Sequence, residues 1–323
     1  MDLKSEGLKN QEYFNGLPVG TQEWIKEVDH EEALDINKIK DLNLTAEQET
    51  AFNEIVNRLK NATGRDIEPH SNFIFELNNL KGGAGLSEEI FQEAVKMGAV
   101  KKMSSHRAIE DFFKIQKIFT IPKEFLSSSE VTRAAEVAVQ NELNGMLCDP
   151  NGAMEVKEAF HLTNETFKAI AEKSLIATLK RGFARAKEIR RLVTADFINS
   201  LEVQQAAQEG IIKDLDVNIN NIPAAAIMIK ENFTLSADFL TSAELQTLVE
   251  KSAAHLLKMG SINIVLDLKR EFGLSDEVLT RLGQEGIRIC LLNFRYEEAA
   301  MIKKALNLSD KLYKEVQEEI TKK

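Results

Sequence analysis

Apolar residues recur three and four positions apart through most of the chain, a spacing that predicts amphipathic helices. Three of these stretches follow a shared motif: Phe, then Leu or Ile, any residue, Ser, any residue, Glu, and Val or Leu. The motif occupies residues 125–131, 197–203 and 239–245. Its Ser and Thr residues are predicted to cap the next helix, because a hydroxyl oxygen accepts hydrogen bonds from the free N–H groups of a first turn. The pattern predicts an all-α fold.

A small residue recurs within these helices, and a leucine follows it five positions later. The small residues are Ala138, Ser174, Gly210, Ser252 and Gly286, and the leucines are Leu143, Leu179, Leu215, Leu257 and Leu291. Small side chains on one helical face let a second helix approach closely. A recurrence every 34–42 residues predicts a tandem repeat. An earlier, more diverged copy fits Leu86 to Phe119, with Ala94 at the small position.

A second helix is expected in each repeat, and it carries an apolar residue followed by a basic one. The basic residues are Lys157, Arg190, Lys230, Lys269 and Lys303. Superposed repeats place them in one row along the protein. Such a row is suited to an extended acidic ligand, but the interpretation we prefer is that the side chains cover an apolar groove.

Helical hairpins of this kind bury their apolar faces only when they stack on their neighbours. The array resembles the tetratricopeptide-like and pentatricopeptide-like superclass of helical-hairpin repeats, over roughly Leu86 to Lys323. The Trp, Leu-Gly, Tyr and closing Pro of the tetratricopeptide pattern are not followed, so no ligand code is carried over. We expect an α-solenoid of about six stacked hairpins, and the resemblance implies that the solenoid is right-handed.

Residues 1–85 lack the repeat. A helix is expected over residues 21–40, and a second one from a capping box at Thr45 and Gln48 to about Asn61. Periodicity does not assign Phe73–Leu77 to strand or helix. The run Lys81–Gly85 lacks the Gly-Lys-Ser/Thr ending of a phosphate-binding loop, and we interpret it as a flexible break. The predicted regions are a helical N-terminal cap or accessory region (1–85), alternatively a separate binding module, and the repeat array (86–323).

The chain has 323 residues and a formal net charge of −10. It contains no apolar run long enough to span a membrane and no start typical of a signal peptide, so we expect a cytoplasmic protein. Its two cysteines are far apart, Cys148 being the more exposed one by expectation, and no histidines have metal-ligand spacing. We therefore expect no disulfide, metal, cofactor or catalytic residue.

The most unusual local feature is basic. Eight basic residues lie between Lys168 and Leu192, opposed by Glu172 and Glu188. Because Lys180–Phe183 is the expected hairpin turn, these groups flank one bend and are predicted to form one patch. The candidate binding residues here are Lys173, Lys180, Arg181, Phe183, Arg185, Lys187, Arg190 and Arg191. The preferred interpretation is a solvated face, or one paired with Asp214 and Asp216. The alternatives are an acidic protein partner and a nucleic acid on which Phe183 stacks.

These features favour a non-catalytic scaffold or adaptor that binds a protein or peptide on the concave face of the solenoid. A second hypothesis is an RNA-binding protein that uses residues 168–192. A third is an enzyme whose site lies between the N-terminal region and the first repeats, for which the sequence contains no motif. The sequence leaves the oligomeric state open.

Overall fold

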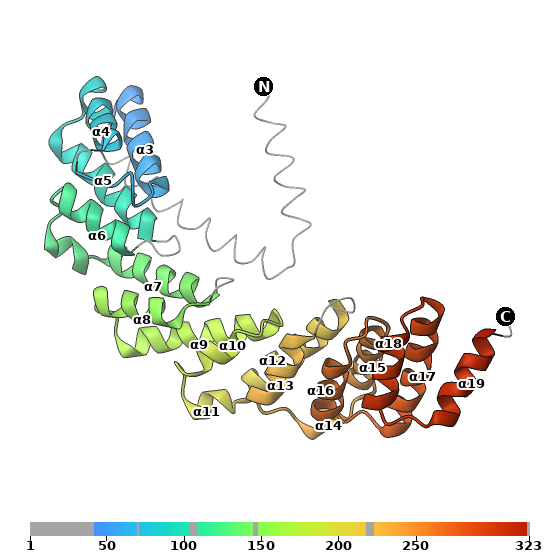
Figure 1. The fold of residues 1–323 in the computed structure, drawn as a ribbon. Coiled ribbons are helices and arrows are strands. Elements are labelled where there is room, and N and C mark those ends of the chain that lie inside the picture. Colours follow the sequence, from blue (N-terminus) through green and yellow to red (C-terminus); the bar gives the residue numbers. More distant parts are fainter. Residues whose placement is uncertain (1–41, 70, 104–108, 145–147, 218–222, 322–323) are drawn as a thin grey trace. The chain divides into compact units, whose positions relative to one another are not determined.

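The computed structural model describes residues 42–69, 71–103, 109–144, 148–217 and 223–321. All regular structure in these ranges is helical, and they contain no strand (Figure 1). The expected all-α fold is confirmed. The helix expected over residues 21–40 lies outside the described residues.

Contacts divide the described residues into two compact units, and the division falls between Phe125 and Leu126. The boundary expected at the glycine run near Gly85 lies inside unit 1, because helices on both sides of this run pack on one another. The regions 1–85 and 86–323, which rest on the sequence repeat, stay predictions.

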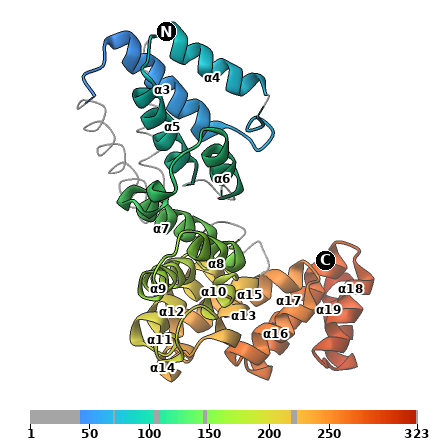
Figure 2. The same ribbon diagram turned by 90° about the vertical axis from the view of Figure 1, so that its left-hand side faces the viewer.

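In its described part, unit 1 contains α3 (Ala46–Asn61), α4 (Asn72–Gly83), α5 (Glu88–Met103) and α6 (Ile109–Ile118). Helix α3 packs along α5, α4 packs on α3, and α6 packs on α5 (Figure 2). The predicted capping box is confirmed: Thr45 Oγ1 accepts a hydrogen bond from the Gln48 backbone N–H, and Gln48 Oε1 accepts one from the Thr45 backbone N–H.

The structure assigns Phe73–Leu77 to helix α4, which Ser71 caps by accepting a hydrogen bond from the Ile74 backbone N–H. Helix α4 continues through Gly83, so the flexible break expected from Lys81 onwards is wrong for its first three residues. Glycine is common just past a helix C-terminus, where the chain adopts a left-handed conformation that a Cβ disfavours. Within the run Lys81–Gly85, Gly85 adopts this conformation, with φ at 64°.

A short 3-10 helix, η1 (Lys123–Ser127), crosses the division between the units. The helices of unit 2 are α7 (Ser129–Asn144), α8 (Pro150–Ala159), α9 (Asn164–Lys180), α10 (Ala186–Arg190), α11 (Ala195–Ile198), α12 (Leu201–Val217), α13 (Ala224–Asn232), α14 (Ala237–Leu240), α15 (Ala243–Lys258), α16 (Ile262–Phe272), α17 (Asp276–Leu292), α18 (Tyr296–Ala305) and α19 (Asp310–Thr321).

The helices of unit 2 pack on their neighbours in chain order (Figure 1). The long helices are α7, α9, α12, α15, α17 and α19, and each of the first five contacts the next long helix. Each of the first five also contacts the shorter helix that follows it: α8, α10, α13, α16 and α18, respectively. This packing is compatible with a helical repeat fold.

The predicted helix caps are confirmed at all three copies of the sequence motif. Ser128 Oγ accepts a hydrogen bond from the Val131 backbone N–H, Ser200 Oγ one from Val203, and Ser242 Oγ one from Leu245, each at 3.3 Å. Ser275 caps α17 in the same way, with Val278 as the donor. These hydroxyls fix where each long helix begins.

Close approaches between consecutive long helices occur at glycines. A Cβ on Gly210 would overlap the carbonyl oxygen of Leu179, and one on Gly286 would lie 3.1 Å from the Cβ of Leu257. Unit 1 repeats this contact between α5 and α3, where a Cβ on Gly98 would lie 2.7 Å from the Cβ of Leu59. A glycine of α5 thus makes this close approach in unit 1, and Ala94, the small residue of the sequence pattern, is fully buried in the same helix.

Candidate functional site

The candidate basic residues of segment 168–192 surround the turn between α9 and α10. The turn lies where the sequence predicted it. Helix α9 ends at Lys180, and Gly182 adopts a left-handed conformation with φ at 69°. Two backbone hydrogen bonds close this turn, from Gly182 N–H to Leu179 O and from Phe183 N–H to Thr178 O. A Cβ at Gly182 would lie 2.8 Å from Gly210 O of α12. The turn is therefore fixed by its own backbone and by the neighbouring long helix.

Several of the candidate basic side chains are engaged by acidic or amide groups. Lys180 Nζ lies 3.6 Å from a carboxylate oxygen of Glu209 in α12, and Lys187 Nζ lies 4.0 Å from one of Glu188. Arg191 donates a hydrogen bond of 2.8 Å to Asn151 Oδ1 in α8. These contacts disperse part of the predicted patch toward the neighbouring helices.

Asp214, one of the acidic partners expected for the basic residues, caps a neighbouring helix. Asp214 is 6% exposed, and its Oδ2 accepts a hydrogen bond of 2.8 Å from the backbone N–H of Ala226. It thus caps the first turn of α13 from the adjoining α12. Glu209, which the sequence pattern did not single out, forms an ion pair with Lys180.

Three candidate residues, Lys173, Arg181 and Arg190, make no ion pair or side-chain hydrogen bond within the described ranges. Lys173 and Arg190 are exposed and Arg181 is half-buried. Phe183 is 43% exposed beside them, and Arg185 is exposed two residues further on. We call Arg181, Phe183, Arg185, Lys187 and Arg190 the basic turn.

The row of repeated basic residues has a structural role at most of its positions. Lys269 pairs with Asp276 at 2.6 Å, and Lys303 pairs with Asp310. The ammonium group of Lys157 lies 5.2 Å from the ring centroid of Phe167, and Lys230 is half-buried. Lys157, Lys269 and Lys303 thus each contact the first turn of the next helix. Both interpretations of the row, cover of an apolar groove and binding of an acidic ligand, stay predictions.

The same connection is present in unit 1, where Lys81 pairs with Glu88 and lies over the Phe91 ring. In each of the three lysine–carboxylate pairs the two residues are seven positions apart, and the acid directly follows a serine cap. The hydrogen bond from Lys303 lowers the pKa of Asp310, and that from Lys81 lowers the pKa of Glu88. These lysines are therefore links between consecutive hairpins.

An exposed apolar surface, not found from the sequence, lies at two later hairpin turns, α15–α16 and α17–α18. It consists of Met259 after α15, Leu292 at the end of α17, Phe294 in the turn and Tyr296 at the start of α18, all between 55% and 79% exposed. The Phe294 and Tyr296 rings meet edge to face at 6.5 Å. The Arg295 guanidinium donates a hydrogen bond to the carbonyl oxygen of Lys258, which joins the two turns. We call these four residues the apolar turn surface.

Phe294 holds a backbone position that glycine holds in two equivalent turns. Gly182, Gly260 and Phe294 each lie eight residues after the small residue of their helix and have φ at 69°, 77° and 58°. A left-handed conformation costs a residue with a Cβ about 1–2 kcal/mol. The sequence already contains this correspondence, since Gly182, Gly260 and Phe294 occupy the same position in their repeats. It becomes informative only when the backbone conformation of the turn is known.

Nucleophilic and metal-binding chemistry has little support among the described residues. Cys148 is 5% exposed, against the expectation of exposure, because its side chain packs near the Arg185 carbonyl. Burial raises the pKa of its thiol to about 11 and also raises the pKa of Cys290. Within the described ranges no three His, Cys, Asp or Glu side chains are placed to share a metal ion.

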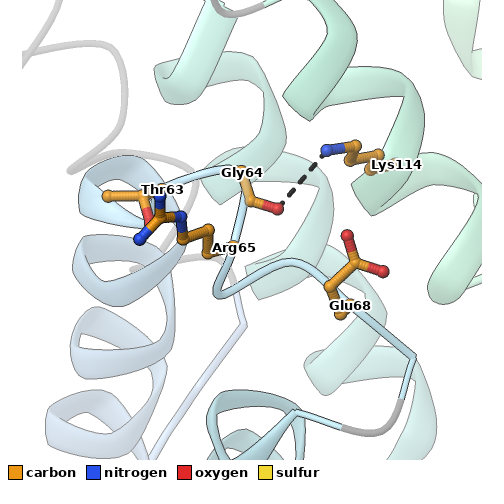
Figure 3. A pocket seen from close by; sticks show the side chains of 5 residues that line it. All are labelled: Thr63, Gly64, Arg65, Glu68 and Lys114. Atoms are coloured by element: carbon orange, nitrogen blue, oxygen red, sulfur yellow. Dashed lines mark hydrogen bonds between the residues drawn. The ribbon is translucent and has the colours of Figure 1, made fainter.

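A shallow hollow in unit 1 is lined by Thr63, Gly64, Arg65, Glu68 and Lys114 (Figure 3). Lys114 Nζ donates a hydrogen bond of 3.3 Å to Gly64 O across it. The hollow is open to solvent and has charges of both signs.

Comparisons with protein-family models, with curated proteins and with solved structures find no match to this chain. Its class is therefore defined by the structure alone: an all-α protein in which many helices pack against their neighbours. None of the described helices has the length and apolar character needed to cross a bilayer.

Proposed function

We propose that this protein is a non-catalytic helical-repeat scaffold that binds a protein or peptide. The repeating unit is a hairpin of a long capped helix and a shorter one, stacked as an α-solenoid of the tetratricopeptide-like kind. Unit 2 supports five such hairpins followed by α19, and α3–α4 and α5–α6 support two more in unit 1. Hairpin arrays of this type offer extended surfaces to other proteins.

The apolar turn surface is the observation that carries this proposal. Its exposed apolar side chains gather at two turns that a hydrogen bond from Arg295 to the carbonyl oxygen of Lys258 joins, and exposed apolar surface of this kind marks an interaction site. The left-handed Phe294 strengthens the argument, because glycine would relieve the strain and phenylalanine at 79% exposure gains little from burial. Contact of the Phe294 ring with another molecule would bury it and offset the strain. This surface favours hairpin turns as the site of binding, and binding on the concave face stays a prediction.

A peptide selection tests the proposal. A phage-displayed library of random peptides is selected on the full chain, and the dissociation constants of enriched peptides are measured by fluorescence anisotropy. Phe294→Gly is expected to weaken the binding of these peptides at least about tenfold, since a single buried aromatic anchor is often worth 2 kcal/mol or more. The matched control is Phe75→Ala, which removes another exposed phenylalanine, 67% exposed, from α4 in unit 1.

The same variant separates a binding role from a structural one. Glycine relieves the left-handed strain but loses the ring contact with Tyr296 and raises the entropy of the unfolded chain. The free energy of unfolding is therefore expected to change by less than about 1 kcal/mol. A proposal based on Phe294 fails if no peptide is enriched, or if peptides bind the native chain and Phe294→Gly equally well.

A further inference from the structure

We propose that the basic turn between α9 and α10 recognises a short acidic segment of a protein partner. This inference rests on the proposed function of peptide binding and names the chemistry of one bound segment. Between Lys180 and Arg191 the chain contains six basic residues and one acidic residue, Glu188. Lys180 and Arg191 are engaged by Glu209 and Asn151, so the other four basic residues, at the turn and in the short helix α10, carry the charge of the proposed site.

The surface is available because part of its charge is not used by the fold. Arg181 and Arg190 have no ion pair or side-chain hydrogen bond in the part of the chain that the structure describes, and Arg190 is exposed. A guanidinium group offers paired N–H donors that match the two oxygens of a carboxylate. The turn is already ordered by Gly182, so little conformational entropy is lost when it binds a ligand.

The positive charge is confined to this hairpin. A surface this short favours a short acidic peptide over a long nucleic-acid strand. The next long helix, α12, carries four acidic residues against Lys213, and α8 on the other side carries Glu155 and Glu158 against Lys157. Both helices are in direct side-chain contact with the basic hairpin, through Glu209 and Asn151. A nucleic-acid strand leaving the turn in either direction meets like charge, whereas a short acidic peptide fits within the turn.

Phe183 adds an apolar contact at the centre of this charge. Its side chain is 43% exposed and follows the left-handed Gly182. An aromatic ring beside guanidinium groups suits a peptide in which an apolar residue interrupts the carboxylates. The acidic character of the whole chain, with a net charge of −10, also disfavours a long polyanion more than a short one.

The test measures anisotropy of fluorescein-labelled probes with the full chain. The first probe is a twelve-residue peptide in which Glu and Asp alternate with Ser and Gly and one Leu stands at the centre. The second replaces each carboxylate by the corresponding amide, and the third is a uridine dodecanucleotide. The acidic peptide is expected to bind, with an affinity that falls as salt increases, and the amide peptide is expected to bind at least about tenfold more weakly.

The site variant is Arg181→Glu with Arg190→Glu, and the matched control is Lys117→Glu with Lys251→Glu. The control makes the same change in net charge at two exposed lysines outside the basic turn that have no ion pair among the described residues. The site variant is expected to weaken acidic-peptide binding at least about tenfold, and the control less than about threefold. Far-ultraviolet circular dichroism verifies that both variants fold.

Three results would overturn the inference: no binding of the acidic peptide, equal weakening by both variants, or tighter binding of the RNA than of the peptide. The last result would assign the turn to nucleic acid. None of them bears on peptides selected through Phe294, so the proposed scaffold function stands or fails separately. Conversely, if Phe294→Gly still binds the acidic peptide, the basic turn and the apolar turn surface are separate binding sites.

Discussion

At the scale of single residues, the close contacts between long helices depend on the absence of a side chain. Gly210 lies against the Leu179 backbone, and its Cβ position would also be 3.0 Å from the Leu179 carbonyl carbon. Backbone atoms cannot move aside as the end of a flexible side chain can. Gly82 in α4 is a natural comparison, because no atom lies within 4 Å of its Cβ position.

Gly210→Ala is therefore expected to lower the free energy of unfolding by about 2–4 kcal/mol, since α9 and α12 must separate to admit the methyl group. Gly82→Ala is expected to raise it by about 0.5–1 kcal/mol, because alanine restricts the unfolded chain and nothing in the fold resists it. Urea denaturation followed by circular dichroism measures both. Equal effects of the two substitutions would show that the close approach at Gly210 is not a determinant of packing.

The cysteines allow a second test at this scale. With a pKa of about 11, Cys148 has almost no thiolate at pH 8, and its side chain is buried. Reaction of the native chain with a disulfide reagent at pH 8 is expected to be slower by at least about a hundredfold than reaction of the urea-unfolded chain. Rapid labelling of Cys148 in the native chain, located by mass spectrometry, would contradict the buried position.

At the scale of elements, the long helices of unit 2 begin at hydroxyl caps, and α17 and α19 are also linked backward by a lysine–carboxylate pair. Ser275 and Ser309 cap α17 and α19, and the acids that follow them, Asp276 and Asp310, receive Lys269 and Lys303. The carboxylates also lie in the first helical turn, where the macrodipole favours negative charge. Cap, acid and lysine thus fix the end of one hairpin to the start of the next.

This arrangement predicts a dependence of stability on pH. The hydrogen bond from Lys303 lowers the pKa of Asp310 below its ordinary 3.8, so the folded state favours the carboxylate. The resulting stability is present above the ordinary value and is lost as the pH falls through the lowered one. Asp310→Asn is expected to lower the urea midpoint at pH 7 and to reduce the loss of stability below about pH 4.

The control is Asp196→Asn, an exposed aspartate of α11 with no ion pair in the described part of the chain. Its profile of urea midpoint against pH is expected to follow that of the native chain. If the profile of Asp310→Asn also matches that of the native chain, the ion pair with Lys303 does not contribute to stability in solution.

At the scale of the whole molecule, the chain consists of two compact units whose contacts are mainly internal. Unit 2 buries its own core, including Leu143, Leu175, Leu179 and Ile189, which are almost fully inaccessible. Residues 126–323 are therefore expected to fold as a separate chain, with a helical circular dichroism spectrum and a cooperative urea transition. A non-cooperative loss of helix would show that unit 2 depends on unit 1.

Much of the fold was accessible from the sequence because its signals are local. A Ser cap and the apolar spacing that follows it lie within one short segment, and the structure confirms the caps at Ser128, Ser200 and Ser242. The turn at Lys180–Phe183 was found for the same reason. Hydrophobic periodicity over long helices is equally local, and it yielded the all-α class.

The tertiary structure decided what depends on residues distant in sequence. Nothing in the pattern near Thr45 shows that α3 packs along α5, or that Gly98 closely approaches Leu59. Periodicity alone did not assign Phe73–Leu77 to a helix, because so short an apolar run fits either kind of element. The apolar turn surface depends on a left-handed backbone at Phe294 and on exposure. The sequence by itself thus determined the helices and their caps, whereas the arrangement of neighbours determined which side chains remain free to bind.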